Sequence, residues 1–167
     1  MSTAIPERRL RIFTLADHEP RVIAAVLAGN SKSNDTNLAA MTVGLGCVAS
    51  GMMIHSAGFH EYLERMFGHC LGWLMALGEK NPFDKIHAER ERQEKLFRDG
   101  INTFNVASPT PDVKRKLRVL TEEVGEVAKA IDKLERINCM TNHRNLREEL
   151  VQVAAVCVAW LESMEGK

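Results

Sequence analysis

An all-α fold is predicted for this chain of 167 residues by two features of its sequence. Apolar residues recur three and four positions apart through most of the chain, which is the spacing that places them on one face of a helix. Strand-like alternation of apolar and polar residues is absent over any useful length. The chain is long enough for one ordinary domain with a sizeable core.

Three helices are expected before residue 80. Pro20 can open a short helix that ends in the polar loop 29–34. A second helix is expected over about 37–54 and a third over about 60–77, where Gly78 provides a stop. Residues 36–60 contain no Asp, Glu, Lys or Arg, but several polar residues and four glycines favour a buried or subunit-packing helix over a membrane span.

Two further helices flank a long irregular stretch. Asn81 and Pro82 supply an N-cap and a first-turn proline for a helix that reaches Phe97. Residues 99–111 are rich in Asn, Ser, Thr and Pro, and we expect them to form a functional loop. The sequence Thr110-Pro111-Asp112 then provides an N-cap, a first-turn proline and an acid that suits the helix dipole.

The last helix is expected to follow a turn over 137–144. Asn145 with Glu148 three positions later forms a start that is similar to a capping box. Apolar residues surround this helix nearly completely from Leu146 to Leu161, so it should be buried on several sides. In a small all-α protein such a helix suggests a four-helix core that a partner subunit completes.

Composition narrows the class of protein only slightly. Lys plus Arg and Asp plus Glu each number 22, so the zero net charge gives no support for binding a nucleic acid polymer or a membrane. The four cysteines form no Cys-x-x-Cys pair and lie mostly among apolar residues, which argues for reduced, buried thiols in a cytoplasmic protein. Charges throughout residues 1–20 argue against a signal peptide.

Two acidic stretches in the last two helices carry the functional signal. Glu123 and Glu126 stand three positions apart, as do Glu149 and Gln152, so each pair shares one helix face with about 5–6 Å between Cβ atoms. Carboxylates beside an apolar face are costly unless a positive group neutralises them. A hard divalent cation with oxygen ligands would do so. The pattern therefore predicts a metal site for a phosphate-containing ligand.

The two stretches resemble the signature of MazG-like nucleoside triphosphate pyrophosphohydrolases, in which Glu-x-x-Glu precedes Glu-x-x-Asp. The resemblance covers about 81–162 and includes the stretch 89–93, while residues 1–80 resemble no family and form an N-terminal helical extension. It implies a MazG-like four-helix core in region 81–167, assembly into homodimers or homotetramers, and hydrolysis of an NTP or dNTP to a monophosphate and pyrophosphate in nucleotide-pool housekeeping. Gln152 departs from the pattern, which has aspartate there.

The resemblance also implies roles for individual residues. Glu123, Glu126 and Glu149, together with Gln152, would hold Mg²⁺, for which Mn²⁺ can substitute. Glu122 is the candidate to orient or deprotonate the attacking water. The candidate substrate contacts are Arg90, Gln93, Phe97, Lys129, Lys133 and Arg144.

Each assignment has an alternative. The acids at 122–126 could be solvated residues that pair with Lys129 and Lys133, and the basic run 114–118 could be a solvated first-turn face. Phe97 could lie in the core, and Glu148 could serve as a cap or as a ligand. An amide oxygen binds Mg²⁺ more weakly than a carboxylate, so Gln152 also allows a catalytically weakened nucleotide-binding protein with a regulatory or oligomerisation role.

Overall fold

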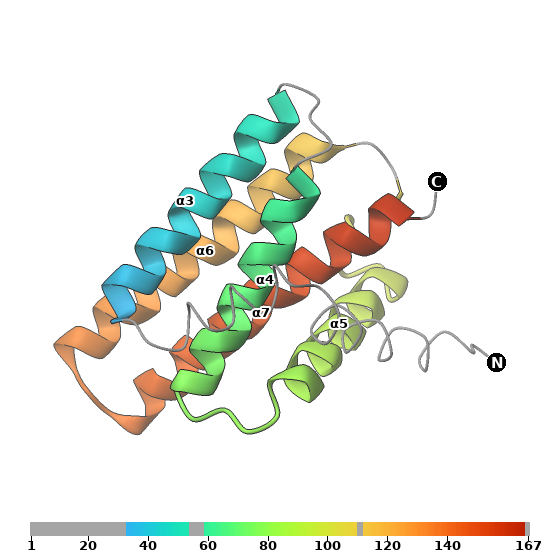
Figure 1. The fold of residues 1–167 in the computed structure, drawn as a ribbon. Helices are drawn as coiled ribbons and strands as arrows, with labels where there is room; N and C mark the ends of the chain where they lie inside the picture. The colour runs from blue at the N-terminus through green and yellow to red at the C-terminus, as the bar shows by residue number, and fades with distance from the viewer. Residues whose placement is uncertain (1–32, 54–58, 110–111, 166–167) are drawn as a thin grey trace.

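The computed structural model describes residues 33–53, 59–109 and 112–165. Within these ranges the chain forms helices and no strand, which confirms the all-α prediction. The helices are α3 (Asn34–Met53), α4 (Phe59–Ala76), α5 (Pro82–Arg98), α6 (Val113–Arg136) and α7 (Met140–Glu165) (Figure 1). The short helix expected after Pro20 lies outside the described residues.

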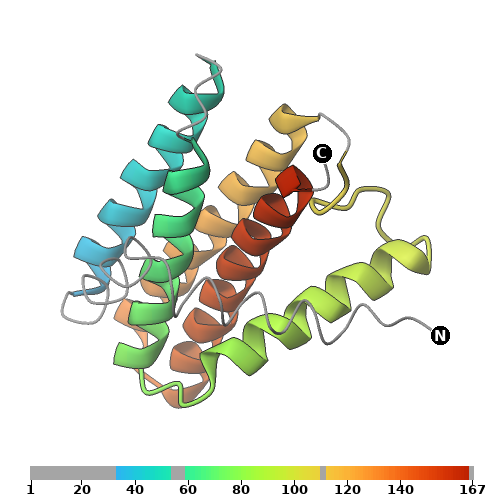
Figure 2. The same cartoon turned by 45° about the vertical axis from the view of Figure 1, so that its right-hand side comes forward.

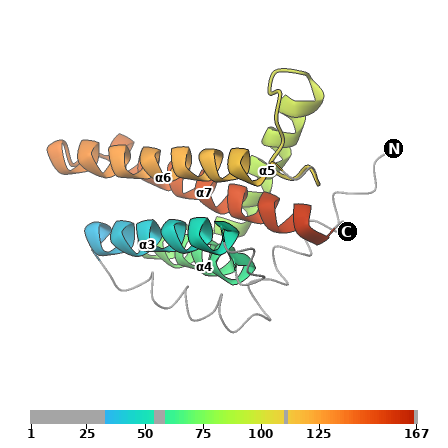
Figure 3. The same cartoon turned by 90° about the horizontal axis from the view of Figure 1, so that it is seen from above.

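Four of the helices form a bundle of two layers. Seen from above, α3 and α4 make one layer and α6 and α7 make the other (Figure 3). Helix α5 starts against α7 and diverges from it toward its own C-terminal end, where a loop returns to the start of α6 (Figure 2). Because α5 diverges, one region of the molecule is bordered by α5, the loop, α6 and α7.

Helix α7 is the centre of the hydrophobic core. Its residues are buried without interruption from Val153 to Leu161, as expected from their apolar character. The covering residues come from α4, α5 and α6 of the same chain, and Trp160 is 1% exposed. The apolar surface of α7 therefore does not call for a partner subunit. Self-association stays a prediction, with support from α3, where Val43 is 66% exposed and Asp35 is the one charged residue.

The two regions predicted from the sequence, 1–80 and 81–167, contribute to the same core. Leu63, Phe67 and Leu71 of α4 are fully buried in one cluster with residues of α6 and α7. On α6 the buried residues recur at helical spacing, and they are Lys116, Leu120, Val124, Val127, Ala130, Ile131 and Leu134. Within the described ranges, α3 and α4 are thus part of the bundle.

The start of α7 differs from the sequence prediction. The turn is only 137–139, and α7 already begins at Met140, so the expected capping box at Asn145 and Glu148 is wrong. Asn142 closes the connection instead, because its amide nitrogen donates to the carbonyl oxygens of Lys133 and Ile137 at 3.0 and 2.6 Å. These two bonds satisfy acceptors at the end of α6.

The start of α6 differs by two residues from the expected position. Asp112 is the N-cap, in place of Thr110, and its side chain accepts a hydrogen bond from the backbone amide of Arg115 at 3.0 Å. A carboxylate there satisfies one of the amides that the first turn leaves without a partner. The predicted start of α5 at Asn81 and Pro82 is correct.

The thiols and the apolar helices give two further results. Cys70 and Cys157 are buried, and burial raises the pKa of both thiols, that of Cys157 to about 12. Cys47 and Cys139 are only half-buried, so the expected burial holds for two of the four. No helix in the described part of the chain is long and apolar enough to cross a membrane.

The shared core predicts that region 81–167 does not fold alone. A fragment of these residues lacks α3 and α4, so the side of α7 that packs on α4 becomes exposed to water. We expect aggregation or loss of cooperative unfolding, measured by size-exclusion chromatography and thermal denaturation. A soluble, monomeric fragment that unfolds cooperatively would contradict the single core.

Candidate acidic site and adjoining cavities

The structure brings carboxylates of three helices together. Glu123 of α6 is half-buried, and its pKa is raised to about 7 by burial and by the negative charge of Glu149 on α7. Glu122, Glu89 and Glu126 raise this pKa further. The predicted proximity of the acidic stretches of α6 and α7 is therefore present, and α5 adds a carboxylate that the sequence did not assign to the site.

Glu149 is in a similar environment. Its pKa is raised by burial first, then by the charges of Glu126 and Glu148, while Lys133 acts in the opposite direction. Glu89 raises it as well. Because like charges close together disfavour ionisation, the cluster carries more negative charge than its own surroundings neutralise.

Three of these acids, Glu149, Glu126 and Glu89, form hydrogen bonds or ion pairs with neighbouring side chains. The amide nitrogen of Gln152 donates to Oε2 of Glu149 at 2.8 Å. Lys129 pairs with Glu126 on the exposed side of α6. The guanidinium of Arg92 contacts both carboxylate oxygens of Glu89, each at 2.7 Å. An aspartate at position 152 could not donate to Glu149, so Gln152 stabilises the arrangement seen here.

This arrangement is not yet that of a metal site. Among the described residues, no three His, Cys, Asp or Glu side chains lie where they could hold a metal ion together. The donor types do fit a hard divalent cation, which prefers carboxylate and amide oxygens. Ligation would require rotation about side-chain bonds, and a cation would compete with the contacts of Glu126 with Lys129 and of Glu149 with Gln152.

A polar cavity of about 560 Å³ adjoins the acids where α5 diverges from α7. We call it the arginine cavity, because its charged lining consists of the guanidinium groups of Arg92, Arg115 and Arg118 and the carboxyl groups of Glu122 and Glu123. The hydroxyl of Thr103, the ring of Phe104 and the amides of Gln93, Asn102, Asn105 and Gln152 also line it.

A second cavity, of about 570 Å³, lies between α5 and the first half of α7. Arg92 and Gln152 line both cavities, so the two adjoin at the acidic cluster. Arg144, predicted to contact the substrate, lines this second cavity near Glu148, and the two side chains form an ion pair at 3.6 Å.

The other predicted substrate contacts fall in different places. Gln93 lines the arginine cavity. Lys129 and Lys133 are exposed on α6. Lys129 pairs with Glu126, and the charge of Lys133 lowers the pKa of Glu149 against the effects that raise it. Phe97 is 42% exposed and lines neither the arginine cavity nor the second cavity.

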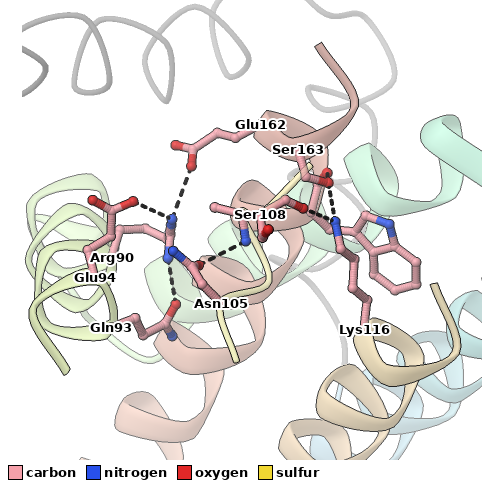
Figure 4. Close-up of polar contacts among 10 residues, drawn as sticks. Arg90, Gln93, Glu94, Asn105, Ser108, Lys116, Glu162 and Ser163 are labelled. Atoms are coloured by element: carbon pink, nitrogen blue, oxygen red, sulfur yellow. Dashed lines mark hydrogen bonds and ion pairs between the residues drawn. The ribbon is translucent and has the colours of Figure 1, made fainter. Parts of the chain in front are cut away.

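Arg90 lies apart from both cavities. It was predicted to contact the nucleoside, but its side chain is 2% exposed and lies outside both cavities. One terminal nitrogen donates to Glu162 of α7 at 3.0 Å and the other donates to Gln93 at 2.8 Å (Figure 4). A buried guanidinium needs such partners, so Arg90 joins α5 to α7.

Sequence reasoning missed the cations of the arginine cavity. Arg115 and Arg118 belong to a basic run that was interpreted as a solvated first-turn face, and Lys116 in the same run is 3% exposed. One signal could have revealed Lys116, because it stands four positions before Leu120 in the apolar stripe of α6. A second signal was that Phe104 lies in the stretch 99–111, which was expected to be a functional loop.

No protein-family model, curated protein or solved structure matches this chain. Functional assignment therefore depends on the geometry of the site and on the resemblance of the two acidic stretches to the MazG-like signature.

The raised pKa of Glu123 predicts a pH-dependent effect of Glu123→Gln in metal-free buffer. Glu123 has a pKa of about 7 in the folded protein and an ordinary pKa of 4.5 in the unfolded chain. Between these two pH values the folded protein keeps a proton on Glu123 that the unfolded chain has lost. The free energy of unfolding of the wild type therefore falls as the pH rises through this window. Since glutamine does not titrate, the variant should be more stable at about pH 8 by on the order of 1 kcal/mol, and the difference should vanish near pH 5.

Urea denaturation at both pH values measures this difference. Glu135→Gln is the matched control, because Glu135 is exposed on the same helix and away from the acidic cluster. A difference in the free energy of unfolding that is equal at both pH values would mean that the folded protein does not raise the pKa of Glu123.

Proposed function

We propose that the protein is a Mg²⁺-dependent nucleoside triphosphate pyrophosphohydrolase. One observation carries the proposal, namely that Glu123 and Glu149 converge beside a cavity whose wall contains several guanidinium groups. Carboxylates suit a divalent cation and guanidinium groups suit phosphate oxygens, so the two halves of a metal-nucleotide complex find complementary chemistry side by side. The MazG-like resemblance supports the same activity.

Glu123, Glu126 and Glu149 are the residues that would hold the cation. When bound, Mg²⁺ supplies positive charge that neutralises phosphate oxygens and acidifies nearby water. Glu122 is exposed, lines the arginine cavity and directly precedes Glu123 on α6. It can therefore accept the proton of a water that attacks the α-phosphorus. The bond from this phosphorus to the bridging oxygen then breaks, which yields a nucleoside monophosphate and pyrophosphate.

A nucleotide-binding protein with weakened catalysis is the second candidate. Gln152 favours it, because its amide nitrogen points to Glu149 and its oxygen is a weaker ligand than a carboxylate. A regulatory or oligomerisation role would then replace turnover. Homodimer or homotetramer assembly and a cytoplasmic location belong to both candidates as predictions.

We expect Glu123→Gln and Glu126→Gln to lower kcat/KM by at least about a hundredfold, because each removes a ligand charge at nearly constant shape. The assay is a panel of ribo- and deoxyribonucleoside triphosphates with Mg²⁺ or Mn²⁺, with pyrophosphate and orthophosphate measured separately. Glu135→Gln should retain full activity. Unchanged turnover in both site variants would exclude the metal assignment, and release of orthophosphate would indicate a different phosphatase.

Gln152→Asp separates the two candidates. The added charge should tighten Mg²⁺ binding by on the order of 1–3 kcal/mol, and turnover should rise by less than about tenfold because ground-state affinity alone does not lower the barrier. Calorimetric titration of Mg²⁺ and the pyrophosphate assay measure these effects. If the wild type is inactive and the variant is active, the natural protein is a binder. If neither quantity changes, Gln152 does not take part in the site.

A further inference from the structure

Two arginines of the arginine cavity have no carboxylate partner among the described residues. Arg115 donates to the hydroxyl of Thr103 at 3.2 Å and lies over the ring of Phe104 at 4.4 Å. Arg118, one turn further along α6, forms no ion pair within the same part of the chain. Guanidinium groups that face a cavity and lack a counter-ion are suited to bind an anion there.

The loop that forms one wall of this cavity is held in place. Nζ of Lys116 donates to the backbone oxygen of Ser108 at 2.8 Å and to the hydroxyl of Ser163 at 2.6 Å (Figure 4). The side chain of Asn105 accepts from the amide of Ala107 at 2.9 Å. The loop is thus ordered before any ligand arrives, which lowers the entropy lost on binding.

The position of the arginines along α6 relates them to the acids. Arg118 and Glu122 are four residues apart, or about 6 Å along the helix axis, and lie on the same side. A ligand that carries several linked negative groups can therefore contact the arginines and reach the acidic cluster at the same time.

We infer that the arginine cavity binds the phosphate chain of a polyphosphate ligand through Arg115 and Arg118. This inference rests on the proposed function for the identity of the ligand as a nucleoside triphosphate. The chemistry of the lining favours phosphate over a base. Phe104 supplies the one aromatic ring among the described lining residues, and Arg115 already covers one face of it. Lys129 and Lys133, predicted for this role, lie outside the cavity.

Lys116 is a positioning residue in this arrangement. It is buried and lies between the loop and α7, so it cannot contact the ligand itself. Its hydrogen bonds fix the loop that carries Thr103 and Phe104, and these two residues in turn orient the guanidinium of Arg115.

Calorimetric titration of the full chain in the presence of Mg²⁺ tests the inference. The probes are inorganic tripolyphosphate and a nucleoside triphosphate whose α,β-bridging oxygen is replaced by methylene, which prevents cleavage. We expect Arg115→Gln and Arg118→Gln each to weaken binding of both probes by about tenfold or more, since each removes one charge-assisted contact. Lys114→Gln is the matched control, because Lys114 is exposed on the same turn and lines no part of the cavity.

The outcomes separate this inference from the proposed function. Equal affinity in wild type, Arg115→Gln and Arg118→Gln would overturn the inference even if the protein hydrolyses nucleotides. Weakened binding in these variants supports it even if no hydrolysis is found. Tighter binding of the nucleotide analogue than of tripolyphosphate identifies a nucleotide as the ligand, and the reverse order identifies an inorganic polyphosphate.

Lys116→Met gives an independent measure of the role of the loop. The variant keeps both arginines and a long apolar side chain, but it loses the hydrogen bonds to Ser108 and Ser163. We expect weaker binding of the nucleotide analogue with a larger unfavourable entropy, because the loop must then be ordered on binding. Unchanged affinity and entropy would show that the loop does not position Arg115.

Discussion

The burial of α7 is the constraint on which the rest of the structure depends. A helix that is apolar nearly all round is stable in water only when neighbours cover most of its surface. Helices α4, α5 and α6 provide this cover, and α3 completes the second layer of the bundle. The order of the helices around α7 follows from this requirement, and it decides which polar residues of different helices become neighbours.

The acidic cluster is a direct result of that packing. Glu149 lies on the less apolar part of α7, and α5 and α6 bring Glu89 and Glu123 close enough to affect one another's ionisation. Charge repulsion opposes this arrangement, and the contacts from Arg92 and Gln152 partly offset it. The fold thus maintains a local excess of negative charge because the apolar contacts of α7 outweigh its repulsion.

Sequence alone could predict the helices and the pairing of Glu123 with Glu126 and of Glu149 with Gln152 along each helix, since both depend on local spacing. The proximity of the two pairs depends on packing, and it was expected from the resemblance of the two stretches to a known signature. The boundary of α7 was missed because Asn142 bonds to carbonyl groups of the preceding helix, a contact that propensity and capping rules do not include. Burial of Arg90 and Lys116 was missed for a related reason. Their partners Glu162 and Ser163 are distant in sequence, and only the packing of α7 brings them together.

The bonds of Lys116 also affect the dynamics of the loop between α5 and α6. Loops that are attached only at their ends open at little free-energy cost, whereas this one is joined through a buried ammonium group to the last turns of α7. Releasing it would break the hydrogen bond from this buried ammonium group to the carbonyl oxygen of Ser108, and loss of a charge-assisted bond away from water is costly. The described part of the loop, 99–109, should therefore open together with the end of the bundle, and its hydrogen-bonded backbone amides should exchange with solvent more slowly than those of a loop attached only at its ends.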